Sequence, residues 1–214
     1  MCCAYLRYAH QRNFLVKSAQ RHFQESVPYF FTGSVRNDMM KIFDDMDSPF
    51  YKSALTFAVD AIDTVSFTKF IADRFKKGGR KAENAVIARI IAFADGVSGD
   101  VQELCEALWE TTEPGGEIST DGFEAAFELI FSREVGGYEA MIERLTPAQG
   151  IVLRALASNP GVQIYSNDFV SCVGMPVSSI RRVVGRLVAD RLVFVRGGTH
   201  RFSNPFFREW LARQ

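Results

Sequence analysis

The chain has 214 residues, of which 47% are hydrophobic and 23% are charged, and its 25 Lys and Arg balance 25 Asp and Glu. This composition predicts an ordinary soluble globular protein. No apolar run approaches the roughly 18 residues that a membrane-spanning helix needs, so we expect no membrane contact. The N-terminal MCCAYLRYAHQR lacks the order of a signal peptide. The four cysteines form no CxxC pair and the three histidines are scattered, so we expect reduced thiols, a cytoplasmic location and no metal site.

The zero net charge conceals a strong segregation along the chain. Residues 1–81 carry a net charge of +5, residues 82–145 carry −11, and residues 146–214 carry +6. Such segregation predicts modules with different partners. We interpret the acidic block as the solvated faces of amphipathic helices rather than as an acidic ligand site.

The N-terminal portion has the alternating pattern of an α/β domain. Periodicity and turn residues predict helices over 11–26 and 36–46 and strands over 28–32 and 54–62. Two strands cannot bury both faces of a parallel sheet, so this part looks incomplete and its exposed strand edges favour self-association. Ser34 follows the first strand, where it either caps the next helix or senses a nucleotide phosphate.

From about residue 64 the pattern predicts helices only. They are expected over 65–79, 81–96, 98–112 and 119–145, with Ser98 as an N-cap and a break at Gly136–Gly137. The residues expected to face the core of the first and third helices are Phe67, Phe70, Ile71, Phe75, Val101, Leu104, Cys105, Leu108 and Trp109.

The last segment predicts a winged helix-turn-helix. A helix over 145–158 has Pro147 in its first turn, a short helix starts at Ser166 or Asn167, and a longer helix covers 176–192. A hairpin around Gly197–Gly198 and a final helix capped by Asn204 complete the order. The predicted fold class is therefore mainly α (α+β).

In this module the helix over 176–192 would enter a DNA groove, with Ile180, Val183, Val184, Leu187 and Val188 facing the core. Its polar residues and those of the hairpin are candidates for contacts to phosphates and base edges. They are Ser178, Ser179, Arg181, Arg182 and Arg186 in the helix, and Arg196, Thr199, His200 and Arg201 in the hairpin. The net charge of +6 favours double-stranded DNA as the partner, while packing against another protein is the alternative.

No complete active site is predicted. The sequence contains no GxxxxGK[ST] loop, no apolar run ending in Asp-Asp or Asp-Glu to hold magnesium, and no G-x-S-x-G elbow or Ser-His-acid set. We therefore expect no catalytic residues and no bound cofactor in this chain alone.

The order of several stretches resembles the C-terminal portion of the archaeal-type P-loop ATPases, within the AAA+ and STAND group. The stretches are VPYFFTGSVRNDMMKIF, SPFYKSA, FTKFIADRF, GVSGDVQELCEALWE, LTPAQGIVLRALA and NPFFREWL. The resemblance covers about residues 15–214. It implies a truncated ATPase core over 1–63, a helical lid over 64–145 and a winged-helix domain over 146–214.

The resemblance also implies roles for individual residues. Ser34 falls at the first sensor position, and Gly96 and Ser98 fall in a turn near the adenine, where Ser98 replaces the family's proline. ATP and magnesium are cofactors of the full-length family, and the Walker A and B motifs are expected before residue 1. The lid and winged helix would then couple nucleotide state to DNA or partner binding. The alternatives are a standalone DNA-binding transcriptional regulator and a protein-interaction adaptor.

Overall fold

The computed structural model describes residues 30–31, 42–55 and 62–214. It divides into two compact units, Met1–Asp60 and Ala61–Gln214, which are described separately. Across the described residues the chain is mainly α-helical, as predicted, with four short strands. The predicted helix over 11–26 and the sensor candidate Ser34 lie outside the described residues.

In the first unit, the predicted strand over 28–32 is wrong at the two positions that the structure describes. Neither Phe30 nor Phe31 is in a strand. The ring of Phe31 instead packs against two other aromatic rings, with centroid distances of 5.1 Å to Phe43 and 6.4 Å to Phe50. Phe30 is 66% exposed. At Phe31 the structure therefore shows packing between aromatic side chains rather than strand pairing.

The helix that precedes Ser48 ends at Phe43, three residues before its predicted end. The Ser48 hydroxyl donates a hydrogen bond to the carbonyl of Ile42, which satisfies an acceptor at the helix end. Turns and bends continue over 51–54, so the predicted strand over 54–62 is wrong at both of its ends; its centre lies outside the described residues.

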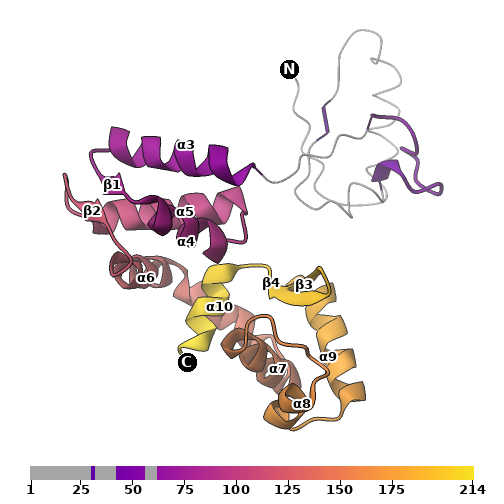
Figure 1. The fold of residues 1–214 in the computed structure, drawn as a ribbon. Helices are drawn as coiled ribbons and strands as arrows, with labels where there is room; N and C mark the ends of the chain where they lie inside the picture. Colours follow the sequence, from indigo (N-terminus) through magenta and orange to yellow (C-terminus); the bar gives the residue numbers. More distant parts are fainter. Residues whose placement is uncertain (1–29, 32–41, 56–61) are drawn as a thin grey trace. The chain divides into compact units, whose positions relative to one another are not determined.

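The second unit begins with a helical bundle, which we define as α3 to α6 (Figure 1). Its helices are α3 (Thr64–Lys77), α4 (Asn84–Phe93), α5 (Ser98–Thr111) and α6 (Gly122–Glu143). Two parallel strands of two residues each, β1 (Lys81–Ala82) and β2 (Glu117–Ile118), join the loops of this bundle. These strands were missed because a two-residue strand carries no periodic pattern.

Two predicted features of the bundle are wrong. Ser98 is the first residue of α5, and Val97 rather than Ser98 is the N-cap. The preceding turn ends at Val97, whose N–H donates to the Ala94 carbonyl at 2.9 Å, so the helix begins one residue earlier than predicted. The predicted break at Gly136–Gly137 is absent, and α6 continues through both glycines. Since Tyr138 beside them is buried, core packing on one side of α6 overrides the low helix propensity of glycine.

The core-facing predictions hold for most, but not all, positions of α3 and α5. Phe70 is 52% exposed and Trp109 is 40% exposed, while Cys105 is half-buried. The indole N–H of Trp109 donates to the Gly78 carbonyl at 3.1 Å, so this side chain closes the end of α3 from outside the core. The remaining predicted residues are buried: Phe67, Ile71, Phe75, Val101, Leu104 and Leu108.

The winged helix follows, and its elements begin where the capping residues predict. They are α7 (Pro147–Ser158), α8 (Asn167–Val173), α9 (Val177–Ala189), β3 (Val193–Arg196), β4 (Thr199–Phe202) and α10 (Pro205–Ala212). Thr146 and Gln149 form a capping box at the start of α7. Ser166 caps α8 and Asn204 caps α10 through hydrogen bonds from backbone N–H groups to their side-chain oxygens.

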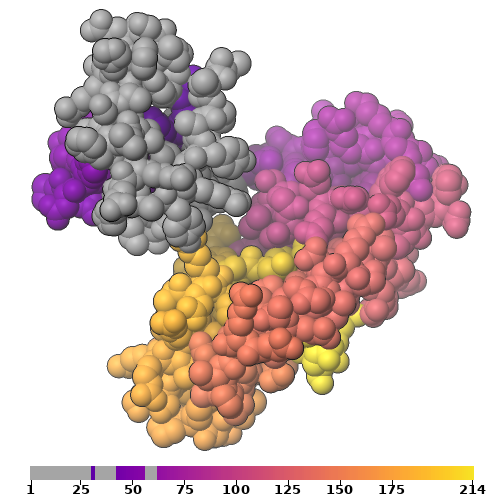
Figure 2. All heavy atoms as spheres, turned by 180° about the vertical axis from the view of Figure 1, so that it is seen from behind, coloured from indigo at the N-terminus to yellow at the C-terminus, as the bar shows by residue number. Residues whose placement is uncertain are grey.

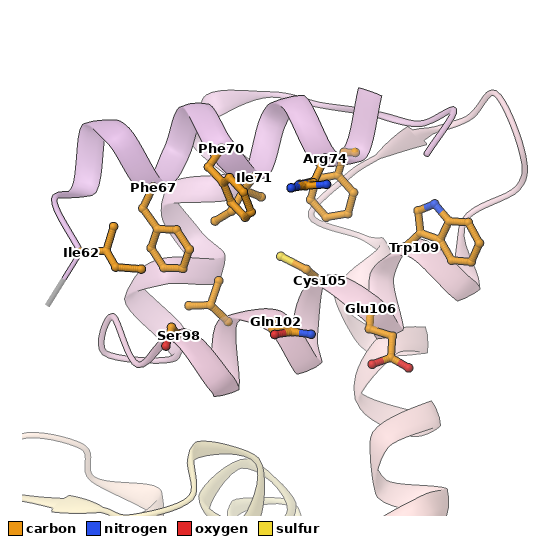
Figure 3. A pocket seen from close by; sticks show the side chains of 12 residues that line it. Ile62, Phe67, Phe70, Ile71, Arg74, Ser98, Gln102, Cys105, Glu106 and Trp109 are labelled. Carbon is orange, nitrogen blue, oxygen red and sulfur yellow. The ribbon is translucent and has the colours of Figure 1, made fainter. Parts of the chain in front are cut away.

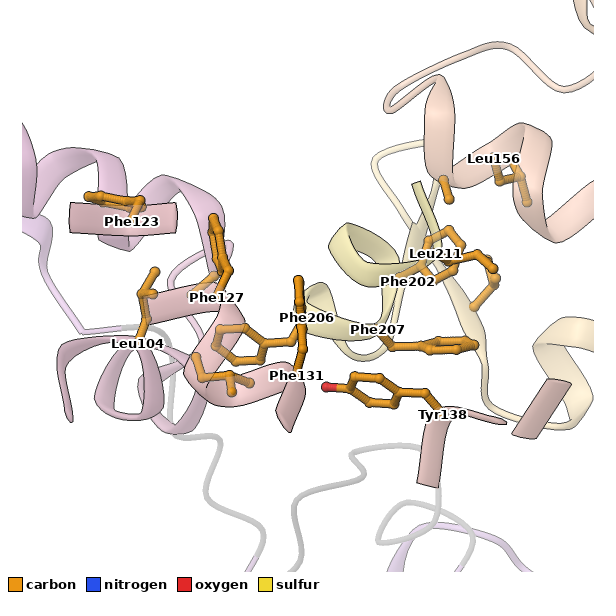
Figure 4. Packing of buried hydrophobic residues seen from close by; sticks show 14 of the residues in the cluster. Leu104, Phe123, Phe127, Phe131, Tyr138, Leu156, Phe202, Phe206, Phe207 and Leu211 are labelled. Carbon is orange, nitrogen blue, oxygen red and sulfur yellow. The ribbon is translucent and has the colours of Figure 1, made fainter. Parts of the chain in front are cut away.

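One hydrophobic core runs through the bundle and the winged helix. In Figure 2, α6 forms a continuous ridge between the two parts. Near its end the buried ring of Tyr138 lies 5.3 Å from Phe207 of α10, and the fully buried Phe206 lies next to the phenylalanines of the bundle (Figure 4). At the C-terminus Arg213 pairs with Glu124 of α6 at 2.5 Å. Helix α10 and the residue that follows it therefore attach the winged helix to the bundle, through apolar and ionic contacts respectively.

Candidate functional site

Helix α9 has a buried face and a face open to solvent. The buried face comprises Ile180, Val183, Val184 and Leu187, as predicted, whereas Val188 is 37% exposed and does not belong to the core. Val188 lies at the edge of the apolar stripe, one residue before the helix ends, so its side chain stays partly exposed to solvent. The four buried side chains fix the rotation of α9 about its axis, which leaves the opposite face free to contact a partner.

That opposite face carries arginines and small residues at helical spacing. Ser178, Arg181, Arg182 and Gly185 follow the i, i+3, i+4, i+7 pattern, and all four are exposed. The Arg181 guanidinium lies 5.5 Å from the ring of Tyr165. Arg182 has no ion pair or hydrogen bond to any residue that the structure describes. This surface, which we call the α9 face, is therefore cationic and accessible.

Two further predicted residues flank the α9 face. Ser179 is half-buried on the same helix. Arg186 forms an exposed ion pair with Asp190 at 3.2 Å, one turn further along. Such an exposed i,i+4 pair contributes only about 0.3–0.5 kcal/mol, so Arg186 can exchange its carboxylate for a phosphate at little cost.

Gly185 lies at the C-terminal end of the α9 face, where no packing between described residues requires a glycine. A β-carbon built at this position would meet no atom within 4 Å. Glycine in a helix interior costs about 1 kcal/mol relative to alanine. The packing of the described residues does not explain this residue, whereas close approach by a partner to the α9 face would.

The hairpin arginines are engaged within the molecule. Arg196 and Arg201 both bind the carboxylate of Asp95, which lies in the turn between α4 and α5. The distances are 2.8 Å from Arg196 Nη1 to Oδ2 and 2.5 Å from Arg201 Nη1 to Oδ1. Sequence reasoning missed Asp95, because it lies 101 residues before Arg196 and belongs to no motif.

His200 belongs to the other face of the hairpin. His200 pairs with Val195 in the register of β3 and β4. Because side chains alternate between the two faces of a strand, His200 and Val195 lie on one face of the hairpin, and Arg196 and Arg201 lie on the other. Burial lowers the pKa of His200, which keeps the imidazole neutral at pH 7. The structure thus brings the predicted α9 residues together and places Arg196 and His200 apart from each other.

The second candidate surface is an apolar groove between α3 and α5 (Figure 3). It encloses about 600 Å³, and its lining is mainly apolar, including Phe67, Phe70 and Val101. Ser98 lies at one end of the groove, at the start of α5. Gly96 lies two residues before Ser98 with φ of +73°, a conformation that glycine adopts without strain. These two predicted nucleotide-sensing residues are therefore close in the chain, but only Ser98 lines the groove.

The cysteine that lines the groove is not a reactive thiol. Burial raises the pKa of the Cys105 thiol to about 12, so this side chain stays protonated and acts as a small apolar residue. Across the ranges that the structure describes, no group of three His, Cys, Asp or Glu side chains could hold a metal ion. In those same ranges, no helix is both long and apolar enough to cross a membrane.

Comparison with known proteins agrees with the fold. Residues 136–213 match a family model described as a probable winged helix domain. Among solved structures, a Walker-type ATPase of Pyrococcus abyssi is similar, with a TM-score of 0.54 and 18% sequence identity. The similarity covers 82% of this chain and 49% of the ATPase chain, so this chain spans about half the length of that protein. No curated protein matches the sequence. The chain thus shares its fold with part of a Walker-type ATPase and carries a winged helix domain in its C-terminal third.

Proposed function

We propose that the chain is the helical-lid and winged-helix portion of an ATP-dependent switch, and that its α9 face binds double-stranded DNA. The observation that carries this proposal is the α9 face itself. It presents Arg181 and Arg182 to solvent, with Arg186 beside it, and it includes a glycine that the packing of the described residues does not explain.

The dimensions of the α9 face suit the major groove. An α-helix with its side chains is about 10–12 Å in diameter. A single α-helix fits the major groove of B-DNA, which is about 12 Å wide. The arginines would contact phosphates or guanine edges, and Ser178 would add a hydroxyl near the start of the helix. Gly185 would let the backbone of α9 approach the duplex closely.

The ATP-dependent half of the proposal rests on the helical bundle. We infer that the bundle acts as a lid, in which Ser98 and the α3–α5 groove lie toward the base of a nucleotide. The sequence has no GxxxxGK[ST] loop, so it supplies no recognised cradle for the phosphates or for magnesium. Ser98 and the α3–α5 groove would therefore contribute contacts at the base, and Ser34 stays the predicted sensor of a phosphate. ATP hydrolysis by the purified 214-residue chain above the rate of a protein-free control would contradict this assignment.

DNA binding is tested by an electrophoretic shift of a fluorescent 30-base-pair duplex, repeated from 50 to 200 mM salt. We expect binding that weakens with salt, because arginine–phosphate contacts release counterions from the DNA. The double variant Arg181→Ala, Arg182→Ala should bind more weakly and with a shallower salt dependence. Its log–log slope should fall by about 0.9 for each arginine–phosphate interaction that the substitutions remove.

The matched control is Arg144→Ala, which removes an exposed arginine at the end of α6, outside helix α9. It should bind the duplex as the unchanged chain does. No shift at low salt, or a shift that does not respond to salt, would overturn the DNA proposal and leave the protein-interaction adaptor as the better account. Binding that is weakened equally in the control would show that net charge, not the α9 face, governs affinity.

A further inference from the structure

We propose that Asp95 is an internal competitor of DNA: its carboxylate occupies the phosphate-binding arginines of the hairpin and keeps them away from a duplex bound at the α9 face. This inference rests on the proposed function and adds a means of regulating the same site. According to this proposal, Asp95 of the helical bundle controls how tightly the winged helix binds DNA.

The geometry of the contact resembles that of an arginine pair around a phosphate. Each carboxylate oxygen of Asp95 accepts from a different arginine, one from the end of β3 and one from the middle of β4. Arg196 and Arg201 lie on one face of the hairpin, so a single anion can engage both. Guanidinium groups bind carboxylates and phosphates through the same charged hydrogen bonds. Asp95 therefore fills a site whose chemistry suits a phosphate oxygen.

The position of Asp95 links this contact to the nucleotide-sensing turn. Asp95 has φ of +51° and Gly96 has φ of +73°, so both are left-handed residues of one tight turn. Ser98 follows three residues after Asp95 and lines the α3–α5 groove. A change in this turn that followed binding in the groove would move the Asp95 carboxylate relative to the hairpin.

The contact is also weak enough to be exchanged. The side chains of Asp95, Arg196 and Arg201 are 33%, 56% and 44% exposed, and half-exposed ion pairs of this kind are only marginally stable. A cavity of about 360 Å³, lined in part by Asp95, Arg201 and Phe93, lies beside the contact. Arg201 thus has space beside it to leave the carboxylate, and the more exposed Arg196 can leave toward solvent.

The test compares duplex affinity of the unchanged chain with that of Asp95→Asn at fixed salt. Asparagine tolerates positive φ and keeps the shape of the side chain while removing its charge. We expect about three- to tenfold tighter binding, because the hairpin arginines are released. The matched control is Glu139→Gln, which removes one exposed carboxylate of α6 that forms no ion pair with any described residue. It should leave affinity unchanged.

A second pair of variants shows whether the gain depends on the hairpin. In a chain that already carries Arg196→Ala and Arg201→Ala, adding Asp95→Asn should change affinity less than twofold. An equal gain in both backgrounds, or no gain in the chain that retains its arginines, would overturn the inference while leaving DNA binding intact. If none of the variants binds DNA at low salt, the proposed function fails first, so the two failures are distinguishable.

Discussion

The rings of Phe93 and Phe206 lie with their centroids 5.3 Å apart, where the end of α4 meets the start of α10. Phe93 is also 5.0 Å from Phe127 of α6, so three helices meet at these rings. Arg208, two residues after Phe206, lies over the Phe93 ring at 5.8 Å. Through this contact the helical bundle and the winged helix pack against each other within the compact unit Ala61–Gln214.

Truncating Phe206 should therefore destabilise both parts together. Phe206→Ala removes a fully buried ring and is expected to cost about 3–5 kcal/mol of unfolding free energy. Guanidinium unfolding followed by circular dichroism measures the change. Phe70→Ala, at an exposed position of α3, is the control and should cost less than about 1 kcal/mol. Equal destabilisation of the two variants, or unfolding confined to the winged helix, would contradict a shared core.

Arg80 holds α3 and α5 together from the outer end of the bundle. Its guanidinium is buried, donates to the Thr112 carbonyl at 3.1 and 2.9 Å and to the Gly78 carbonyl at 3.0 Å, and lies 4.0 Å from the Trp109 ring. Lysine cannot reproduce this planar arrangement.

We expect Arg80→Lys to lower the free energy of unfolding by about 2 kcal/mol, because the half-buried Thr112 carbonyl loses both guanidinium donors, whereas the Gly78 carbonyl keeps the Trp109 indole N–H. Lys77→Ala, which breaks the exposed pair with Asp73, should change it by less than about 0.5 kcal/mol. If Arg80→Lys were as stable as the unchanged chain, the positive charge alone, rather than the several N–H donors of the guanidinium, would hold α3 and α5 together.

The continuity of α6 through Gly136 and Gly137 can be tested directly. Both glycines are helical, and a β-carbon at either would meet no atom within 4 Å. Replacing each by alanine should therefore stabilise the chain by about 1 kcal/mol. Gly79→Ala is the control, because its φ of +73° makes alanine destabilising there. Destabilisation by the α6 substitutions would show that the helix is broken at these glycines in solution.

Glu103 gives stability a defined dependence on pH. Burial, reinforced by the neighbouring charges of Glu134 and Asp100, raises the pKa of Glu103 above its usual value. A raised folded-state pKa means that the folded chain binds the proton more tightly, so this group favours folding at low pH. Its contribution is lost as pH rises from the unfolded pKa through the folded one.

Glu103→Gln should consequently raise the melting temperature at pH 7 and have no effect near pH 4. The group is half exposed, so after solvent screening the gain should stay below about 1 kcal/mol, or less than about 4 °C for a chain of this size. Glu113→Gln, in the exposed loop after α5, should change neither value. A stabilisation that persists at pH 4 would mean that packing, not charge, is responsible.

Local signals in the sequence predict much of the winged helix. Ser166, Asn204 and the proline after it mark helix starts because capping depends on neighbouring residues alone. The hairpin follows from Gly197 and Gly198, which both adopt positive φ. These features need no knowledge of distant parts of the chain.

Features that depend on tertiary contacts could not be predicted in this way. Glycines in α6 indicate a break, yet burial of Tyr138 and Phe131 keeps the helix continuous. Arg201 was expected to face DNA, and its pairing with Asp95, 106 residues away, is visible only in the folded chain. The α9 face itself was predicted because the apolar stripe of that helix fixes which residues are exposed.

The central claim is that the α9 face binds duplex DNA, and Gly185→Ala tests it most directly through two measurements on one variant. Alanine should raise the unfolding free energy by about 1 kcal/mol, since α9 gains helix propensity and no clash is present. The same variant should bind a duplex about tenfold more weakly, because the added methyl group would hold α9 away from the DNA. A more stable chain with weaker DNA binding is the predicted result. A more stable chain with unchanged DNA binding would contradict close contact between α9 and DNA.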